Sequence, residues 1–118
     1  MNEDLRVRTK AFALRVIKMY SALRKSDPVA QVLGKQVLRS GTSVGANYRE
    51  SYRARSGPEF VSKLGDCLKE LEETAYWLEL LVESNCVSSA KMAKLLDETN
   101  QLTAIFTTIV KKTKSGLS

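Results

Sequence analysis

The sequence has no histidine, and it has only two cysteines and two prolines in 118 residues. Histidine is the usual proton carrier near neutral pH and the commonest metal ligand. Its absence excludes the Glu-x-x-His pairs that di-iron helical bundles require. On one helix, Cys67 and Cys86 would stand roughly 28 Å apart, whereas a disulfide needs Cα atoms within about 7 Å. We therefore expect free thiols in a reducing compartment.

Long apolar runs are missing as well. No stretch approaches the roughly 20 residues that a membrane-spanning helix needs. The first residues, with Glu3, Asp4, Arg6 and Arg8, lack the apolar region of a signal peptide. We expect a cytoplasmic protein with no membrane partner.

Charge is abundant and unevenly distributed. The net charge is +6 and the pI about 9.5. Residues 1–25 carry seven bases and two acids, whereas residues 58–87 carry seven acids and two bases. One acidic segment inside a basic chain suits a bundle in which the acidic helix meets basic neighbours, within the chain or at a subunit contact.

Apolar residues recur at three- and four-residue spacing through most of the chain, which is typical of amphipathic helices. The pattern predicts four helices, over about residues 3–25, 28–55, 58–84 and 88–113. Short connections between them predict an all-α, antiparallel up-down-up-down four-helix bundle. We expect a single domain over residues 1–118.

Helix breaks and one unusual segment refine this prediction. Asp27 is expected to cap the second helix with Pro28 at its first position, and Gly57-Pro58 marks the next break. Two glycines, Gly41 and Gly45, lie among hydroxyl residues within the second helix. We predict that this helix continues through them or kinks there, because the apolar stripe keeps its phase. The glycines would let a neighbouring helix approach closely.

Groups that could perform catalysis are few. Glu70, Glu72 and Glu73 could serve acid–base chemistry or bind a hard cation, but a solvated face or ion pairs with basic helices is the favoured interpretation. Cys67 lies on an apolar stripe and is interpreted as a small core residue, since a reactive thiol wants an activating base. No Gly-Lys-Ser/Thr phosphate loop follows Gly41 and Gly45. We predict no enzymatic activity, no metal and no cofactor.

Basic side chains suggest contact with a polyanion. On the first helix Arg8, Arg15 and Lys18 share a face, and on the second Arg49 and Arg53 stand beside Tyr48 and Tyr52. Arginine next to aromatic residues suits phosphate contact and base stacking. A solvated face whose tyrosines belong to the core is the alternative, and the sequence leaves both open. The predicted nucleic-acid contacts are Arg8, Arg15, Lys18, Arg49, Arg53 and Lys112.

Two large apolar residues of the third helix, Trp77 and Leu80, lie off its apolar stripe. A helix that is apolar over more than one face needs a second partner, often another subunit. We predict that Trp77 and Leu80 form an oligomer contact.

Residues 36–83 resemble a known family. The run Gln36 to Arg53, then Phe60 and Glu70-Leu71, is similar to the four-helix-bundle proteins encoded in intervening sequences of bacterial 23S ribosomal RNA genes. The matching signature positions are Arg39, Ser43, Val44, Asn47, Glu50, Phe60, Glu70 and Leu71. Ser51 replaces the family's usual glycine, and Cys67 stands at the place of a serine, which changes local backbone freedom and one hydrogen bond.

The resemblance implies a bundle that assembles into a homo-oligomeric ring, a pentamer. A relative, the accessory variability determinant of diversity-generating retroelements, is similar in build: a basic pentamer that binds nucleic acid and a reverse transcriptase. The resemblance thus implies fold and self-association more than task. The basic surface, with this relative, suggests binding of RNA or DNA through phosphate contacts, with little sequence preference. A protein adaptor or scaffold, whose basic face docks an acidic partner, is the alternative function.

The polar signature residues share one helical face, since Ser43, Asn47 and Glu50 are spaced four and three apart. Polar groups buried without partners would be costly. We therefore predict a structural hydrogen-bonded network in which Arg39 pairs with a carboxylate, either Glu70 or Glu50. Contact of this row with a ligand is the alternative interpretation.

Overall fold

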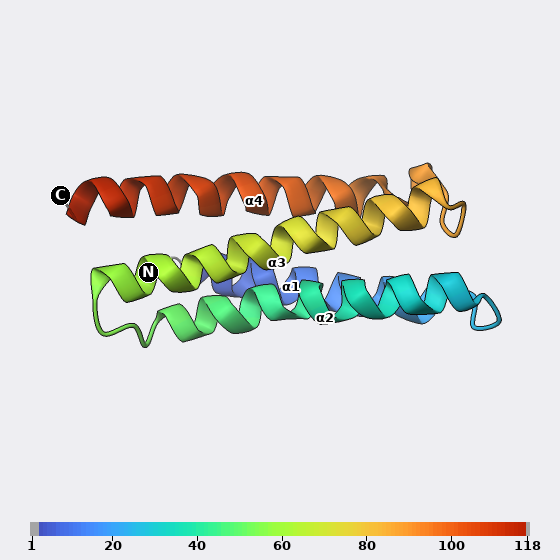
Figure 1. Ribbon diagram of the computed structural model, residues 1–118, viewed down its shortest axis with the longest axis horizontal. Helices are drawn as coiled ribbons and strands as arrows, with labels where there is room; N and C mark the ends of the chain where they lie inside the picture. Colours follow the sequence, from blue (N-terminus) through green and yellow to red (C-terminus); the bar gives the residue numbers. More distant parts are fainter. Residues whose placement is uncertain (1–2, 118) are drawn as a thin grey trace.

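The computed structural model describes residues 3–117, so residues 1, 2 and 118 of the predicted domain lie outside the described part. It contains four helices and, between residues 3 and 117, no strand: α1 (Glu3–Ala22), α2 (Pro28–Ser51), α3 (Gly57–Glu83) and α4 (Ser89–Leu117). The predicted all-α class is confirmed. The helices lie along the long axis of a rod of 51 × 20 × 20 Å (Figure 1). None of the helices described there is both long and apolar enough to cross a bilayer.

Side-chain caps define two of the helix starts. The Asp27 carboxylate accepts from the backbone N–H groups of Val29 and Ala30, and Pro28 occupies the first helical position. Ser56 accepts from the N–H of Glu59 and so caps α3. Such caps satisfy N–H groups that have no partner within the helix, and each is worth about 1 kcal/mol. The predicted cap at Asp27 is therefore confirmed.

Three helix ends differ by more than one residue from the sequence-based bounds. α1 ends at Ala22 instead of residue 25, and α2 ends at Ser51 instead of residue 55. Beyond Ser51 the backbone forms i→i−3 turn bonds, such as Arg53 N–H to the Glu50 carbonyl, as the chain reverses. α4 continues to Leu117 instead of ending near 113. Lysines in its final turns favour the negative end of the helix dipole and are good helix formers, so the basic tail extends the helix.

The core receives side chains from all four helices. The largest fully buried residues are Tyr48, Phe12, Phe106, Leu64, Leu71, Leu78, Leu81, Met92 and Leu102. Burying one such side chain stabilises the fold by about 1.5–3 kcal/mol. Tyr48 of α2 meets Phe106 of α4 edge-to-face, with ring centroids 5.5 Å apart, so the core spans the bundle.

Close approach of α1 to α2 depends on the glycines of the continuous helix α2. A Cβ built on Gly41 would stand 2.8 Å from Val16 Cγ2, and one on Gly45 would stand 3.2 Å from Thr9 Oγ1. Real Cβ contacts at the first distance require something to shift, so Gly41 must lack a side chain here. The predicted role of these glycines in helix packing is confirmed.

The three connections alternate between the two ends of the rod. In Figure 1 the α1–α2 and α3–α4 connections lie at one end, and the α2–α3 connection lies at the other end with both termini. Each helix packs extensively on its neighbour in sequence, but α1 and α4 approach each other over only a few residues. The seam between the first and last helices is therefore the least closed of the bundle.

Candidate nucleic-acid interface

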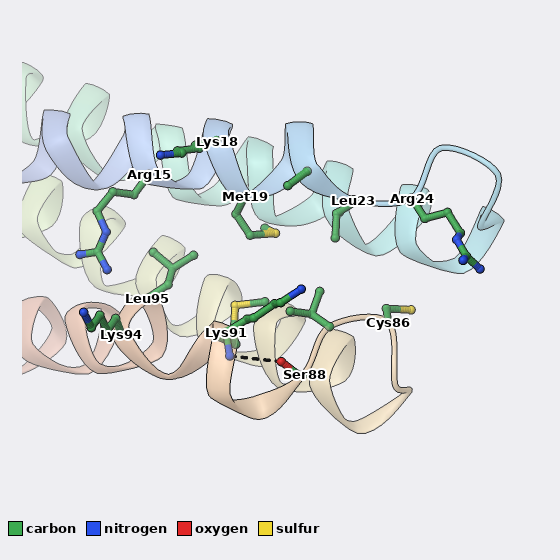
Figure 2. Close-up of a pocket in the computed structure, with 13 residues that line it drawn as sticks. Arg15, Lys18, Met19, Leu23, Arg24, Cys86, Ser88, Lys91, Lys94 and Leu95 are labelled. Carbon is green, nitrogen blue, oxygen red and sulfur yellow. Dashed lines mark hydrogen bonds between the residues drawn. The ribbon is translucent and has the colours of Figure 1, made fainter.

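A groove of about 610 Å³ lies in the α1–α4 seam, between the C-terminal half of α1 and the N-terminal half of α4. Figure 2 shows side chains from both helices meeting across it, with the α3–α4 connection closing one end. The lining residues are Arg15, Lys18, Met19, Ala22, Leu23, Arg24, Cys86, Val87, Ser88, Lys91, Met92, Lys94 and Leu95.

The charged groups of this groove are all of one sign. α1 and its C-terminal turn contribute Arg15, Lys18 and Arg24, while α4 contributes Lys91 and Lys94. Among the described residues that line the groove there is no carboxylate. Like charges gathered in a concave, low-dielectric surface focus the electrostatic field and raise the local concentration of counter-ions. The groove is therefore built to attract anions.

The α3–α4 connection is shaped by the end of α3. Asn85 adopts a left-handed conformation with φ of 64°. The N–H groups of Asn85 and Cys86 then bond the carbonyls of Val82 and Leu81 at 3.0 and 2.9 Å, which is the Schellman pattern. This turn brings Val87 and Ser88 to the groove, where the Ser88 hydroxyl accepts from the Lys91 N–H at 3.2 Å (Figure 2).

One ion pair closes the same seam beyond the groove. Arg8 of α1 donates to both carboxylate oxygens of Glu98 on α4, at 2.8 Å from Nε and 2.7 Å from Nη2. Arg8 also donates to Gln101 Oε1 at 2.8 Å. The hydrogen bonds from Arg8 lower the pKa of Glu98 below its ordinary value of 4.5, although partial burial opposes this shift. Glu98 therefore stays ionised and holds α4 against α1.

The six predicted contact residues fall into three situations. Arg15 and Lys18 line the groove. Arg8 stands outside its lining, in the ion pair with Glu98. The remaining three, Arg49, Arg53 and Lys112, are exposed near the C-terminal ends of α2 and α4, away from the groove. The groove therefore contains two of the six predicted contact residues.

The tyrosines next to Arg49 and Arg53 belong to the body of the protein. Tyr48 is 2% exposed, and the Tyr52 ring packs edge-on against it with centroids 5.4 Å apart. The Arg6 guanidinium covers the Tyr52 ring at 5.3 Å from its centroid. Of the two interpretations left open by the sequence, tyrosines of the core fit this arrangement, and base stacking on Tyr48 does not.

Sequence reasoning missed three groove residues: Arg24, Lys91 and Lys94. A local signal for two of them existed. Lys91 lies in the first turn of α4, which contains no acidic residue, and Lys94 follows three residues later on the same face. Cations near a helix N-terminus oppose the helix dipole and cost about 0.3–1 kcal/mol each. Residues that break a local rule in this way often serve a binding site.

Comparison with known proteins identifies the chain's relatives. The model of the family described as 23S rRNA-intervening sequence protein matches residues 3–108. The chain belongs to this family. It is 34% identical to a protein of unknown function from the S23 ribosomal protein family of Bacteroides thetaiotaomicron, whose crystal structure superposes with a TM-score of 0.83. The match covers 90% of this chain and 97% of that one. No curated protein matches the chain.

The polar signature residues noted in the sequence lie along the α2–α3 seam. Arg39 donates to Glu73 at 2.9 Å and stands 3.5 Å from Glu70. Ser43, by contrast, donates to the Arg39 carbonyl within its own helix at 2.6 Å. Glu50 pairs with Lys63 at 3.3 Å, and Asn47 lines a shallow pocket beside Arg39 and Glu70. The row thus makes separate contacts, and both Arg39 and Glu50 link α2 to α3 through ion pairs.

Buried hydroxyls reinforce this seam. Ser40 of α2 and Thr74 of α3 lie 2.7 Å apart and share a hydrogen bond. Each hydroxyl has one proton, so the one that does not donate in this bond donates to its own helix, Thr74 to the Glu70 carbonyl or Ser40 to the Gln36 carbonyl. Every buried polar atom here is satisfied, which fixes the register of α2 against α3.

The buried Cys67 is not activated as a nucleophile. Burial, and next the charge of Asp66, raise the pKa of the Cys67 thiol to about 12, so it stays protonated at neutral pH. Its sulfur lies 3.5 Å from the Val44 carbonyl, to which it donates. Within residues 3–117 no group of three or more potential ligands could hold a metal ion.

The predicted oligomer contacts lie at the outer edge of the α2–α3 seam. Trp77 and Leu80 follow Glu73 by four and seven residues, so they share its helical face. Val32 stands seven residues before Arg39, the partner of Glu73, and is 62% exposed. Tyr76, next to Trp77, is 55% exposed. The Trp77 Nε1–H is buried without a hydrogen-bond partner in the described part of the chain.

Proposed function

We propose that this protein is a non-enzymatic, self-associating bundle that binds RNA or DNA through the α1–α4 groove, with little sequence preference. The observation that supports this most is the gathering of Arg15, Lys18, Arg24, Lys91 and Lys94 around one groove whose lining contains no acid among the described residues. Phosphate contacts of this kind position a nucleic acid without reading its sequence.

Three ion-paired cations outside the groove contrast with those that line it. Arg8 and Arg39 are engaged by carboxylates, and Lys63 lies beside Glu50. The groove cations have no such partner in their lining. Binding of phosphates would release counter-ions, so the affinity would fall steeply as the salt concentration rises.

Two variants of equal charge test this proposal. Lys18→Gln/Lys94→Gln removes two groove cations, whereas Lys35→Gln/Lys114→Gln removes two exposed cations elsewhere. Filter binding of a labelled RNA at 50–300 mM salt should give a slope of log affinity against log salt that is smaller by about two for the groove variant. The control variant should retain the wild-type slope. No salt-sensitive binding at low ionic strength, or an equal loss in both variants, would overturn the proposal.

The adaptor function is a measurable outcome of the same experiment. An acidic polypeptide of matched length, added as competitor, presents carboxylates without phosphodiester geometry. If it displaces RNA at equal charge concentration, the basic face favours an acidic protein partner. Displacement only at much higher concentration favours nucleic acid.

The proposed self-association is a ring of up-down-up-down bundles, with five copies as the family resemblance implies. Alternation of the connections between the two ends supports the bundle topology (Figure 1). Two different apolar faces support a head-to-tail contact. One is the outer face of α1, where Val7, Leu14 and Ile17 are 64%, 57% and 43% exposed. The other is the outer edge of the α2–α3 seam, with Val32, Tyr76, Trp77 and Leu80.

Charge distinguishes these two faces. Basic residues such as Lys10 flank the first face, and acidic residues such as Glu72 and Glu79 flank the second. Contacts between unlike faces of identical chains close into rings when the rotation permits. Light scattering should report a multiple of 13.2 kDa. Leu14→Glu should lower the mass, and Ser62→Glu should not. A monomer at micromolar concentration would contradict the assembly.

A further inference from the structure

The floor of the α1–α4 groove differs chemically from its rim. Its apolar lining comes from Met19 of α1, Leu23 directly after that helix, Val87 of the α3–α4 connection, and Met92 and Leu95 of α4. Met92 is 1% exposed, whereas Met19 is half-buried and reachable. Leu23 and Leu95 are 6% exposed each and are already covered by the protein, so a phosphate on the rim would leave Met19 partly exposed to water. A ligand with an apolar part next to its negative charge would cover Met19 as well as contact the rim cations.

Nucleic acid duplexes do not offer such a part. Their phosphates lie outside, and the faces of their bases are stacked on one another. An unpaired strand exposes base faces that pack on apolar side chains while the backbone follows cationic groups. The groove combines both kinds of surface within one cavity.

Methionine suits this task without aromatic residues. The thioether is polarisable and unbranched, and it makes favourable contacts with flat rings. Two of the three methionines of the chain line this groove. Flexible side chains of this kind accept purines and pyrimidines alike. The Ser88 hydroxyl also lies at this site, but it accepts a hydrogen bond from the Lys91 N–H and serves as the cap of α4.

We propose that the groove binds unpaired nucleotides, with phosphates on the rim cations and a base face on Met19. This inference rests on the proposed nucleic-acid binding and names the form of nucleic acid that is bound. Lys18 and Lys94 hold the backbone, and Met19 distinguishes a strand with free bases from one without.

Four probes and two variants test it by fluorescence anisotropy. The probes are a mixed-sequence single-stranded RNA, the same strand in a duplex, an abasic oligomer of equal length and AMP. The wild type should bind the single strand about fivefold more tightly than the duplex or the abasic oligomer. Met19→Ala should remove that advantage, a loss of about threefold to tenfold for the single strand alone. Met19→Leu, which keeps an apolar surface, should retain most of it.

A second measurement follows the Met19 side chain by NMR. Base rings stacked on Met19 should shift its ε-methyl carbon–proton signal in NMR spectra when single-stranded RNA is added. The duplex and the abasic oligomer should leave that signal in place. A comparable shift with AMP at similar concentration would assign the site to unpaired nucleotides in free form and not to a strand.

The failures of the two proposals are distinguishable. Equal affinity for all three oligomers, together with weaker binding by Lys18→Gln/Lys94→Gln, would overturn this inference and leave the proposed function standing. Tighter binding of the duplex than of the single strand would do the same. No salt-sensitive binding of any oligomer would overturn both.

Discussion

The α2–α3 seam and the α1–α4 seam join helices in different ways. In the first, Arg39 meets Glu73 at 2.9 Å, and buried Ser40 and Thr74 share a hydrogen bond. In the second, the Arg8–Glu98 pair bridges the helices at one place. Beyond it the seam opens into the groove. Cations paired with carboxylates stabilise the first seam, whereas the groove of the second seam is lined by cations and by no carboxylate among the described residues, which favours binding of an external anion.

The largest expected effect concerns the close packing of α1 against α2. Gly41→Ala should destabilise the protein by about 1–3 kcal/mol, because the new Cβ would stand 2.8 Å from the stiff Val16 side chain. Gly65→Ala is the matched control on α3, where a Cβ would meet nothing within 4 Å. It should stabilise by about 0.5–1 kcal/mol through helix propensity. Urea unfolding measures both, and equal effects of the two would contradict the assigned packing.

A smaller effect is expected at the Arg8–Glu98 ion pair, which joins α1 to α4 beyond the groove. Glu98→Gln should lower the free energy of unfolding by about 1 kcal/mol at pH 7, since it removes a bidentate, partly exposed ion pair. The pKa of Glu98 is lowered in the folded state. The stabilisation is therefore present above the ordinary carboxyl pKa of 4.5 and is lost as the pH falls through the folded value.

Unfolding of the wild type and of Glu98→Gln from pH 7 to pH 2 checks this dependence. The difference between the two proteins should be constant down to about pH 5 and should shrink below about pH 4. If the difference in the free energy of unfolding is unchanged at pH 2, the contribution of the Arg8–Glu98 pair is not electrostatic.

Removing a groove cation should affect stability and binding in opposite directions. Lys91→Glu should stabilise the fold by about 0.3–1 kcal/mol, because it replaces a cation in the first turn of α4 with an anion. The same change should weaken binding of single-stranded RNA about tenfold at low salt. Lys114→Glu, in the last turn of α4, is the control and should destabilise slightly with little effect on binding. Loss of both stability and binding at Lys91 would contradict the account.

The smallest expected effect concerns the two thiols. Cys67 is fully buried with a pKa of about 12, whereas Cys86 lines the open groove. A thiol reagent at pH 8 should modify Cys86 in the folded protein and should reach Cys67 only after denaturation. Bound RNA should slow the reaction of Cys86. Equal reactivity of both thiols in the folded state would show that the core around Cys67 opens easily.

How far the sequence could predict this molecule depends on the range of the interactions. Apolar periodicity and the Asp27-Pro28 cap are local, and they predict four helices and one helix start. The end of α2 at Ser51 depends on where the chain must turn back, and the extension of α4 depends on favourable dipole contacts of its lysines. Neither could be found from apolar spacing alone.

The candidate site shows the same limit. Arg15 and Lys18 were predicted from a shared face on one helix, but the groove also needs Lys91 and Lys94, about seventy residues away along the chain. Arg8 lies on the same face as Arg15, yet Glu98 engages it. Which cation meets a carboxylate is decided by the packing of α1 against α4. One-dimensional charge patterns do not contain that information.

Lysine footprinting tests the central claim most directly. Acetylation of the folded protein with and without RNA, read by mass spectrometry, reports which amines an RNA covers. The account predicts protection of Lys18, Lys91 and Lys94, while Lys10, Lys35 and Lys69 react at unchanged rates. Protection of the second set, or equal reactivity of all six in the presence of saturating RNA, would contradict the assignment of the α1–α4 groove.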